Sequence, residues 1–285
     1  MRIDAHQHYW RYQPQEYAWI SPDMAALQQD FLPENLRPNL LKQQLDGSIV
    51  VQARQTLAET EQILQWSEAS GDVGGVVGWI DVTADDVAEQ LQRLHHPRLR
   101  GFRHVVQDEA DPAGWLQQSS VARGMQTLQQ QQYVWDILVT WRHLLPATEF
   151  AAQHDKHWLV LDHLGKPDIS KGAKAWGQQV AELAAMPHVA CKLSGLVTEV
   201  VDGQWSHAQL QPFIEEALER FGPQRLMFGS DWPVCLLAAE YQDVAGLVEE
   251  TVNRLTPDEQ NRIWGATAAN VYGLTGENHG SVSAK

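Results

Sequence analysis

Three titratable side chains occupy alternate positions in the first apolar segment of the chain, at Asp4, His6 and His8. Alternate side chains of a β-strand point to the same face, so we expect these groups to converge on one side of a buried strand. Neutral imidazoles and carboxylates bind zinc and similar ions, and they also act in general acid–base catalysis. The spacing therefore predicts a metal-binding or catalytic site, although an isolated HxH pair is more often structural.

Other apolar segments end in comparable polar groups, and burying so many of them is costly unless they are paired or functional. These groups are Gln52, Arg54, Arg103, His104, Thr140, Trp141, Arg142, Asp162, His163, Lys192, Ser194, Ser230 and Asp231. Within this set, His163 and Asp231 complete with His6 and His8 the composition of a site for one metal ion that keeps a position for water.

The segments that carry these groups are short, rich in Val, Ile and Leu, and separated by helical stretches. They cover residues 2–8, 47–53, 73–82, 99–106, 133–140, 157–163, 188–196 and 225–233. Nearly continuous apolarity is typical of parallel strands that are buried on both faces. Eight alternations of strand and helix predict an α/β protein with one domain, a (β/α)8 TIM barrel over residues 1–274. Active sites of such barrels lie at the carboxyl ends of the strands, where the polar groups are found.

Local signals place several helix ends. Thr83 is a candidate N-cap for a helix within residues 83–96, and Gly222 is a candidate stop for a helix that begins near residue 206. Thr256 and Glu259 form a capping box, with Pro257 in the first helical turn. The polar segment 275–285 is expected to fray as a C-terminal tail.

Composition excludes some partners. The formal net charge is −15, so the chain should repel phosphate backbones, and we expect no nucleic-acid partner. No apolar run approaches the roughly 20 residues of a membrane span, and no secretory signal is visible. Cys191 and Cys235 lie outside any CxxC pair and are expected to be reduced. We expect a cytoplasmic enzyme for a small molecule, with no membrane partner and with a homo-oligomer as one option.

Longer stretches resemble a known family over nearly the whole chain. They are RIDAHQHYWRY, VVQAR, LRGFRHVVQDEAD, HWLVLDHLGKP, CKLSGLVTE and QRLMFGSDWPVCLL. Together they resemble the amidohydrolase 2 branch of the amidohydrolase superfamily, and within it the sugar-lactone hydrolases. The resemblance matches His6 and His8 to the paired histidines of strand one, and His163 to the histidine of strand six. It matches Asp231 to the aspartate of strand eight that accepts a proton from the hydrolytic water.

The same resemblance bears on metal content. The segment WDILVT offers no bridging lysine or histidine on strand five, so we expect one metal site at most, held by His6, His8, His163 and Asp231. Zinc is the foremost candidate. Some enzymes of this branch use one metal and some need none, so the resemblance leaves open whether the ion is required for activity.

The resemblance implies hydrolysis of a sugar lactone, L-fucono-lactone or a related aldonolactone, to the aldonic acid in sugar degradation. Asp231 and His163 are the expected catalytic residues. We expect the substrate to be bound by Arg54, Arg103, His104, Trp141, Lys192 and Trp19. An aldonolactone isomerase and a metal-dependent decarboxylase of the same branch stay open as alternatives. A catalytically silent sugar-binding barrel is a third alternative, and the presence of Asp231 argues against it.

Overall fold

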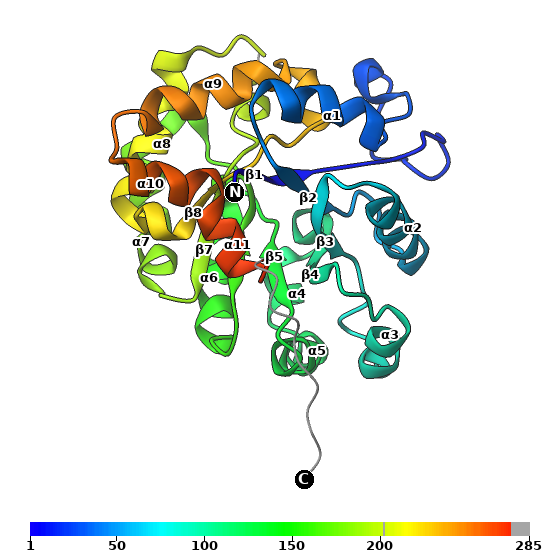
Figure 1. Cartoon of the computed structure of the whole chain (residues 1–285). Helices are drawn as coiled ribbons and strands as arrows, with labels where there is room; N and C mark the ends of the chain where they lie inside the picture. Colours follow the sequence, from blue (N-terminus) through cyan, green and yellow to red (C-terminus); the bar gives the residue numbers. More distant parts are fainter. Residues whose placement is uncertain (202, 275–285) are drawn as a thin grey trace.

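A computed structural model describes residues 1–201 and 203–274, so the predicted tail at 275–285 lies outside the described residues. Eight strands form one parallel sheet in the order β1 to β8. A bridge between Gln7 and Trp232 brings the last strand beside the first, and the sheet becomes a nearly closed barrel (Figure 1). The strands are β1 Ile3–Gln7, β2 Gly47–Val51, β3 Val73–Gly78, β4 Leu99–His104, β5 Val134–Ile137, β6 Leu159–Leu161, β7 Val189–Leu193 and β8 Leu226–Phe228. The predicted (β/α)8 barrel is confirmed.

Helices surround the barrel (Figure 1). They are α1 Pro33–Lys42, α2 Leu57–Ala69, α3 Val87–Arg93, α4 Pro112–Leu116, α5 Ser119–Gln130, α6 Leu144–Gln153, α7 Ala173–Ala185, α8 His207–Phe221, α9 Tyr241–Val252, α10 Pro257–Asn261 and α11 Thr267–Val271.

Most of the predicted helix ends are confirmed. Gly222 follows α8, and the capping box of Thr256 and Glu259 begins α10. The prediction for Thr83 is wrong, because α3 begins after Asp86. The Thr83 hydroxyl donates instead to the Asp81 carboxylate at 2.6 Å, which stabilises a turn before the helix.

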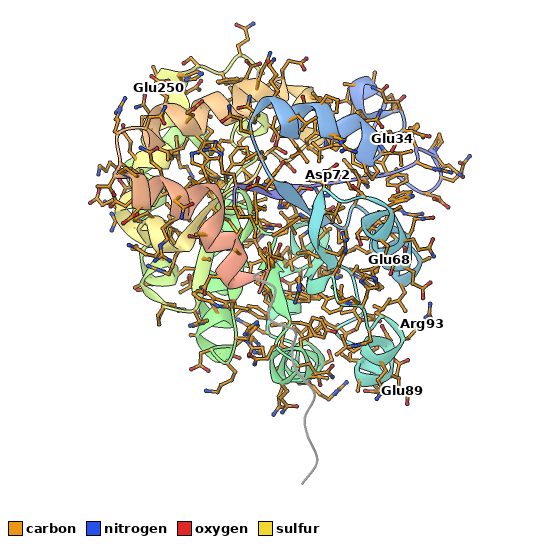
Figure 2. The ribbon with its side chains drawn as sticks, viewed as in Figure 1. Glu34, Glu68, Asp72, Glu89, Arg93 and Glu250 are labelled. Atoms are coloured by element: carbon orange, nitrogen blue, oxygen red, sulfur yellow. The ribbon has the colours of Figure 1, made fainter. Side chains whose placement is uncertain are left out.

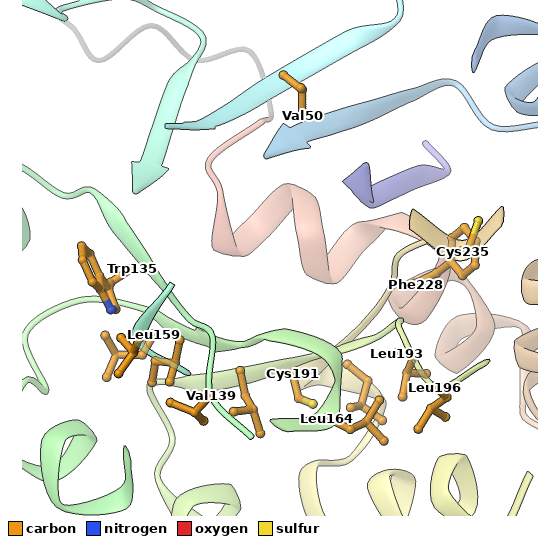
Figure 3. Packing of buried hydrophobic residues seen from close by; sticks show 14 of the residues in the cluster. Val50, Trp135, Val139, Leu159, Leu164, Cys191, Leu193, Leu196, Phe228 and Cys235 are labelled. Atoms are coloured by element: carbon orange, nitrogen blue, oxygen red, sulfur yellow. The ribbon is translucent and has the colours of Figure 1, made fainter. Parts of the chain in front are cut away.

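The hydrophobic core has two parts. The larger part lies between the strands and the outer helices, where Leu159, Leu164 and Leu193 pack together with the buried Cys191 (Figure 3). The smaller part lies inside the barrel and includes side chains of β1 to β3 and β5 to β8 together with residues of α11. Because α11 packs against this inner layer, the opposite end of the barrel, where the strands end, remains for a site. Both cysteines are free thiols, as expected.

Many of the charged side chains lie on the outer helices. Glu34, Glu68, Glu89, Arg93 and Glu250 project from α1, α2, α3 and α9 (Figure 2). In the part of the chain that the structure describes, no helix is long and apolar enough to span a membrane.

Candidate active site

The strand ends bring four side chains to one point. The Nε2 atoms of His6, His8 and His163 lie 3.7, 3.3 and 3.9 Å from Oδ1 of Asp231. All four side chains are buried. We call these four residues the His/Asp cluster; they are the four that the sequence predicts as metal ligands.

Hydrogen bonds to the outer nitrogens orient two of the three rings. His8 Nδ1 lies 2.8 Å from the carbonyl oxygen of Val51, which can only accept, so Nδ1 carries the proton and Nε2 of the neutral ring has a lone pair. His163 Nδ1 lies 2.8 Å from the Ser194 hydroxyl, which leaves its Nε2 to face the cluster. Such partners on the far nitrogen are typical of metal-binding histidines.

The cluster has the donor set of a cation site. His6 Nε2 and His8 Nε2 are 3.2 Å apart, and both face the anionic oxygen of Asp231. Two or three imidazoles with one carboxylate are a common ligand set for a catalytic zinc ion. The residues therefore fit a single divalent ion.

Electrostatics keep these groups in the states that such a site needs. Burial lowers the pKa of His6 well below its ordinary value and that of His163 to about 4. Burial raises the pKa of Asp231, but the neighbouring imidazoles, His163 first among them, more than reverse this shift, so its pKa lies below the ordinary value. At neutral pH the cluster thus combines neutral His6 and His163 with an anionic carboxylate.

Left-handed backbone presents part of the cluster. After β6 the residues His163, Leu164, Gly165 and Lys166 have φ values of 52°, 55°, 68° and 48°. Asp231, after β8, has a φ of 56°. Residues other than glycine rarely adopt this region, and such strain concentrates at functional sites. The turn directs both His163 and Lys166 toward one cavity.

A fully buried layer of charges lies beneath the cluster. Lys192 on β7 pairs with Asp136 on β5 and with Asp162 after β6, at 2.5 and 3.0 Å. Arg103 on β4 binds the other oxygen of Asp162 at 3.0 Å. Through Lys192 Nζ and Asp162 Oδ1, which lie 3.1 and 3.3 Å from its Nδ1, this layer fixes the ring of His6 from below.

Asp4 has a structural place in this arrangement. Its carboxylate accepts hydrogen bonds from the backbone and hydroxyl of Ser230 and from the Tyr241 hydroxyl. The predicted convergence of Asp4 with His6 and His8 on one face of the strand is wrong. The pairing register of β1 shifts between Asp4 and Gln7, and the Asp4 side chain is turned toward Tyr241 of α9 in the outer part of the core. Its bonds attach the segment after β8, which carries Asp231, to the first strand.

A cavity of about 550 Å³ opens above the cluster. Its lining includes three of the predicted substrate-binding residues, namely Arg54, Arg103 and Trp19, and three members of the cluster, namely His8, His163 and Asp231. His6 is fully buried and does not line the cavity. The segment between β1 and α1 forms one wall: Glu16 binds Arg54 at 2.6 Å, and Trp19 stacks edge to face on Trp10.

Three predicted substrate-binding residues do not line this cavity. Lys192 is fully buried in the charged layer. His104 follows Arg103 on the same strand and so points the other way, where it binds Glu109 at 2.7 Å and stacks on Trp115. These two residues and Trp141 are thus not part of the cavity lining, and their contact with substrate stays a prediction.

Trp141 occupies a separate place near the turn after β5. Lys171 Nζ lies 3.7 Å and Arg142 Cζ 4.4 Å from the ring centroid, so two cations contact this ring.

The structure adds residues that the sequence did not indicate. Glu16, Gln55, Gln107 and Lys166 line the cavity. Lys166 stands in the stretch HWLVLDHLGKP, so its position after His163 was a usable signal. The others lie in loops, and only the folded structure shows which of their side chains face the cavity.

Comparison with known proteins assigns the family. The family model described as "Amidohydrolase" matches residues 3–274. The chain belongs to the amidohydrolase family. A curated L-fucono-1,5-lactonase of Burkholderia multivorans is 45% identical to this amidohydrolase over 96% of both chains. A second one, from Burkholderia ambifaria, is 34% identical over 98% of both chains.

A solved structure is similar to the amidohydrolase as a whole. A Burkholderia multivorans amidohydrolase with bound zinc superposes with a TM-score of 0.93 at 46% identity. The match covers 96% of this chain and 99% of the other. That relative holds zinc, and in the present chain His6, His163 and Asp231 of the His/Asp cluster lie close enough together to be candidate ligands.

Proposed function

We propose that this protein hydrolyses a sugar lactone, with L-fucono-1,5-lactone as the first candidate, to the aldonic acid. The observation that carries the proposal is the His/Asp cluster at the floor of an open cavity, in a chain whose curated relatives are L-fucono-1,5-lactonases. A role in L-fucose degradation in the cytoplasm is consistent with this activity.

Asp231 is the proposed general base. Its anionic carboxylate takes a proton from a water molecule, whose oxygen then attacks the lactone carbonyl carbon. In the tetrahedral intermediate, the bond between that carbon and the ring oxygen breaks. Asp231 returns its proton to the departing ring oxygen, which becomes a hydroxyl group. His163 borders the same space and positions the water.

The His/Asp cluster would hold one divalent ion, and zinc fits its donor set. When bound, such an ion supplies Lewis-acid polarisation of the carbonyl group. The buried layer below supports this proposal from the protein side, because Asp162 and Lys192 fix the ring of His6 at its other nitrogen.

The residues that line the cavity suit a sugar lactone better than a simple ester as the substrate. Arg54 and Arg103 present N–H donors, and Gln55 and Gln107 add amide groups that can bind hydroxyls. The ring of Trp19 offers an apolar face to a sugar ring or a methyl group. Binding energy from these contacts is available to orient the carbonyl group.

A comparison of substrates tests the proposal. We expect kcat/KM for L-fucono-1,5-lactone to exceed that for a plain alkyl ester and for an amide of the same acid by about 100-fold or more. The plain ester lacks the sugar ring that the cavity binds, and the amide has a poorer leaving group. Product NMR must show the open-chain aldonate. A plain ester that matches the best lactone contradicts the sugar-lactonase proposal. A rearranged lactone as product indicates an isomerase, and released CO₂ indicates a decarboxylase.

A further inference from the structure

Lys166 is a cavity-lining cation that the mechanism above leaves unused. Among the described residues that line the cavity, Arg54 is paired with Glu16 and Glu59, and Arg103 is paired with Asp162. Lys166 forms no ion pair with any described carboxylate. An ammonium group that is half-buried at a cavity wall and left without a counter-ion is available to an anion.

The backbone fixes where this side chain begins. The Lys166 N–H donates to the carbonyl of His163 at 2.8 Å, and its own carbonyl accepts from Trp141 N–H at 3.3 Å. Lys166 has a φ of 48°, a strained conformation for a residue with a side chain. It is followed by the buried Pro167, which restricts the chain further. The chain thus tolerates strain to present Lys166 beside His163.

Lys166 lines the same cavity as His163 and Asp231, so its side chain shares that space with the His/Asp cluster. Burial is the largest cause that lowers the pKa of His163 to about 4, and the Lys166 charge contributes to the same shift. Burial raises the pKa of Glu199, a half-buried residue beyond β7, and the Lys166 charge opposes that rise.

Lactone hydrolysis turns a neutral substrate into an anion. Negative charge first appears on the carbonyl oxygen in the tetrahedral intermediate. After that intermediate collapses, the aldonic acid releases a proton to water, and the product then carries the charge on its carboxylate. A fixed cation beside the reacting carbonyl stabilises the transition state more than the neutral substrate, and this difference raises kcat. Arg54 and Arg103 are less suited to this part, because carboxylates already neutralise them.

We propose that Lys166 is a catalytic residue that binds the carbonyl oxygen as it becomes negative, and then the carboxylate of the aldonate product. This inference rests on the proposed lactonase function. It requires no proton transfer from Lys166, which stays an ammonium ion throughout and acts through its charge and its N–H donors.

Substitution of Lys166 tests the proposal. We expect Lys166→Met to lower kcat for L-fucono-1,5-lactone by about 100-fold with little change in KM. Lys166→Arg, which keeps the charge, should recover at least tenfold of the loss. Lys171→Met is the matched control, since Lys171 comes from the same loop but contacts Trp141 and Asp168 outside the cavity. All variants are compared at equal metal content. A cooperative thermal unfolding transition first shows that each variant is folded.

Product inhibition gives a readout that a merely structural role would not change. The inhibition constant of L-fuconate should rise about tenfold in Lys166→Met, while that of the uncharged alditol should stay the same, because only the carboxylate meets the ammonium. If both inhibitors weaken equally, or if only KM rises, Lys166 binds hydroxyls and the proposal is wrong.

The two levels of the proposal can be told apart. An active wild-type enzyme with an equally active Lys166→Met variant contradicts the role of Lys166 alone. A wild-type enzyme that hydrolyses no aldonolactone contradicts the proposed function, and the role of Lys166 fails with it.

Discussion

Asp231 is the residue on which the proposed chemistry depends most. Its Oδ1 lies within 4 Å of three imidazole nitrogens, and its carboxylate is buried at the cavity floor. We expect Asp231→Asn to lower kcat by about 100-fold or more, since an amide cannot accept the proton of water. Asparagine tolerates positive φ well, so the fold should survive. Circular dichroism and thermal unfolding should show a native-like variant.

The control for this change is Asp155→Asn, which removes an exposed carboxylate that pairs with Lys156 and does not line the cavity. It should leave turnover unchanged. Near-native turnover by a folded Asp231→Asn enzyme would remove Asp231 from the mechanism.

The pH dependence of activity reports on His163. Burial lowers its pKa from 6.5 to about 4, so the ring stays neutral in the folded enzyme well below pH 6. Protonation would remove the Nε2 lone pair, and activity should therefore fall only as pH drops through about 4. A profile of kcat/KM from pH 3 to 8 checks this. An acid limb centred near pH 6.5 would show that His163 titrates as an ordinary histidine.

At the scale of elements, the positions of the strands and of the cluster could be predicted from sequence. Parallel buried strands have a clear apolar signal, and the fold places their carboxyl ends on one rim. Side-chain depth and direction were harder to predict. Lys192 points inward but lies one layer too deep, because the stagger between strands sets the depth of each residue.

Side chains along a strand point alternately to its two faces, so the direction of each one can be predicted only when the register of the strand is known. Arg103 faces the cavity, and His104 must therefore face the outer helices. Loop residues such as Lys166 have no such rule. The left-handed turn that presents Lys166 is stabilised by contacts from other strands, which the local sequence does not contain.

Gly195, two residues after the end of β7, tests how closely the segments that follow the strands pack against the cluster. It has a φ of +67°, and a Cβ there would lie 2.7 Å from the ring of His163. We expect Gly195→Ala to displace His163 and to lower kcat/KM by about 100-fold, as misplaced catalytic groups do. Kinetics with a lactone substrate measure this.

Gly172→Ala is the matched control. Gly172 also has a positive φ, of +79°, but a Cβ there would meet nothing within 4 Å. It should lower stability by about 1 kcal/mol through backbone strain and leave kcat/KM unchanged. Equal losses of activity in both variants would show that strain, and not contact with His163, causes the effect.

At the scale of the whole molecule, the charges inside the barrel limit the metal content. Strand β5 carries no bridging lysine or histidine, as expected from the sequence. Its inward carboxylate, Asp136, is bound by Lys192 and by the Tyr272 hydroxyl. A second ion would have to displace a buried ammonium group. We expect at most one divalent ion per chain, measured by elemental analysis of protein that has been incubated with excess zinc and then desalted.

Substitution of a ligand separates specific from incidental metal. His8→Ala should reduce the metal content and activity together, because His8 contacts both His6 and Asp231 within the cluster. Two ions per chain would contradict the single-site prediction. Full activity after complete removal of metal would leave the cluster to act through hydrogen bonds alone.

The most direct measurement of the proposed reaction follows the oxygen of water. Hydrolysis of L-fucono-1,5-lactone by the enzyme in water enriched in ¹⁸O, followed by mass spectrometry of the product, shows which bond the water forms. Attack by a water activated at Asp231 predicts one ¹⁸O atom in the carboxylate and none in the hydroxyl groups, at a rate that Asp231→Asn abolishes. A product without ¹⁸O would mean that the acyl group moves between hydroxyls of one molecule, and an ¹⁸O-labelled hydroxyl would mean that water attacks the ring carbon. Either result would contradict hydrolysis at the lactone carbonyl.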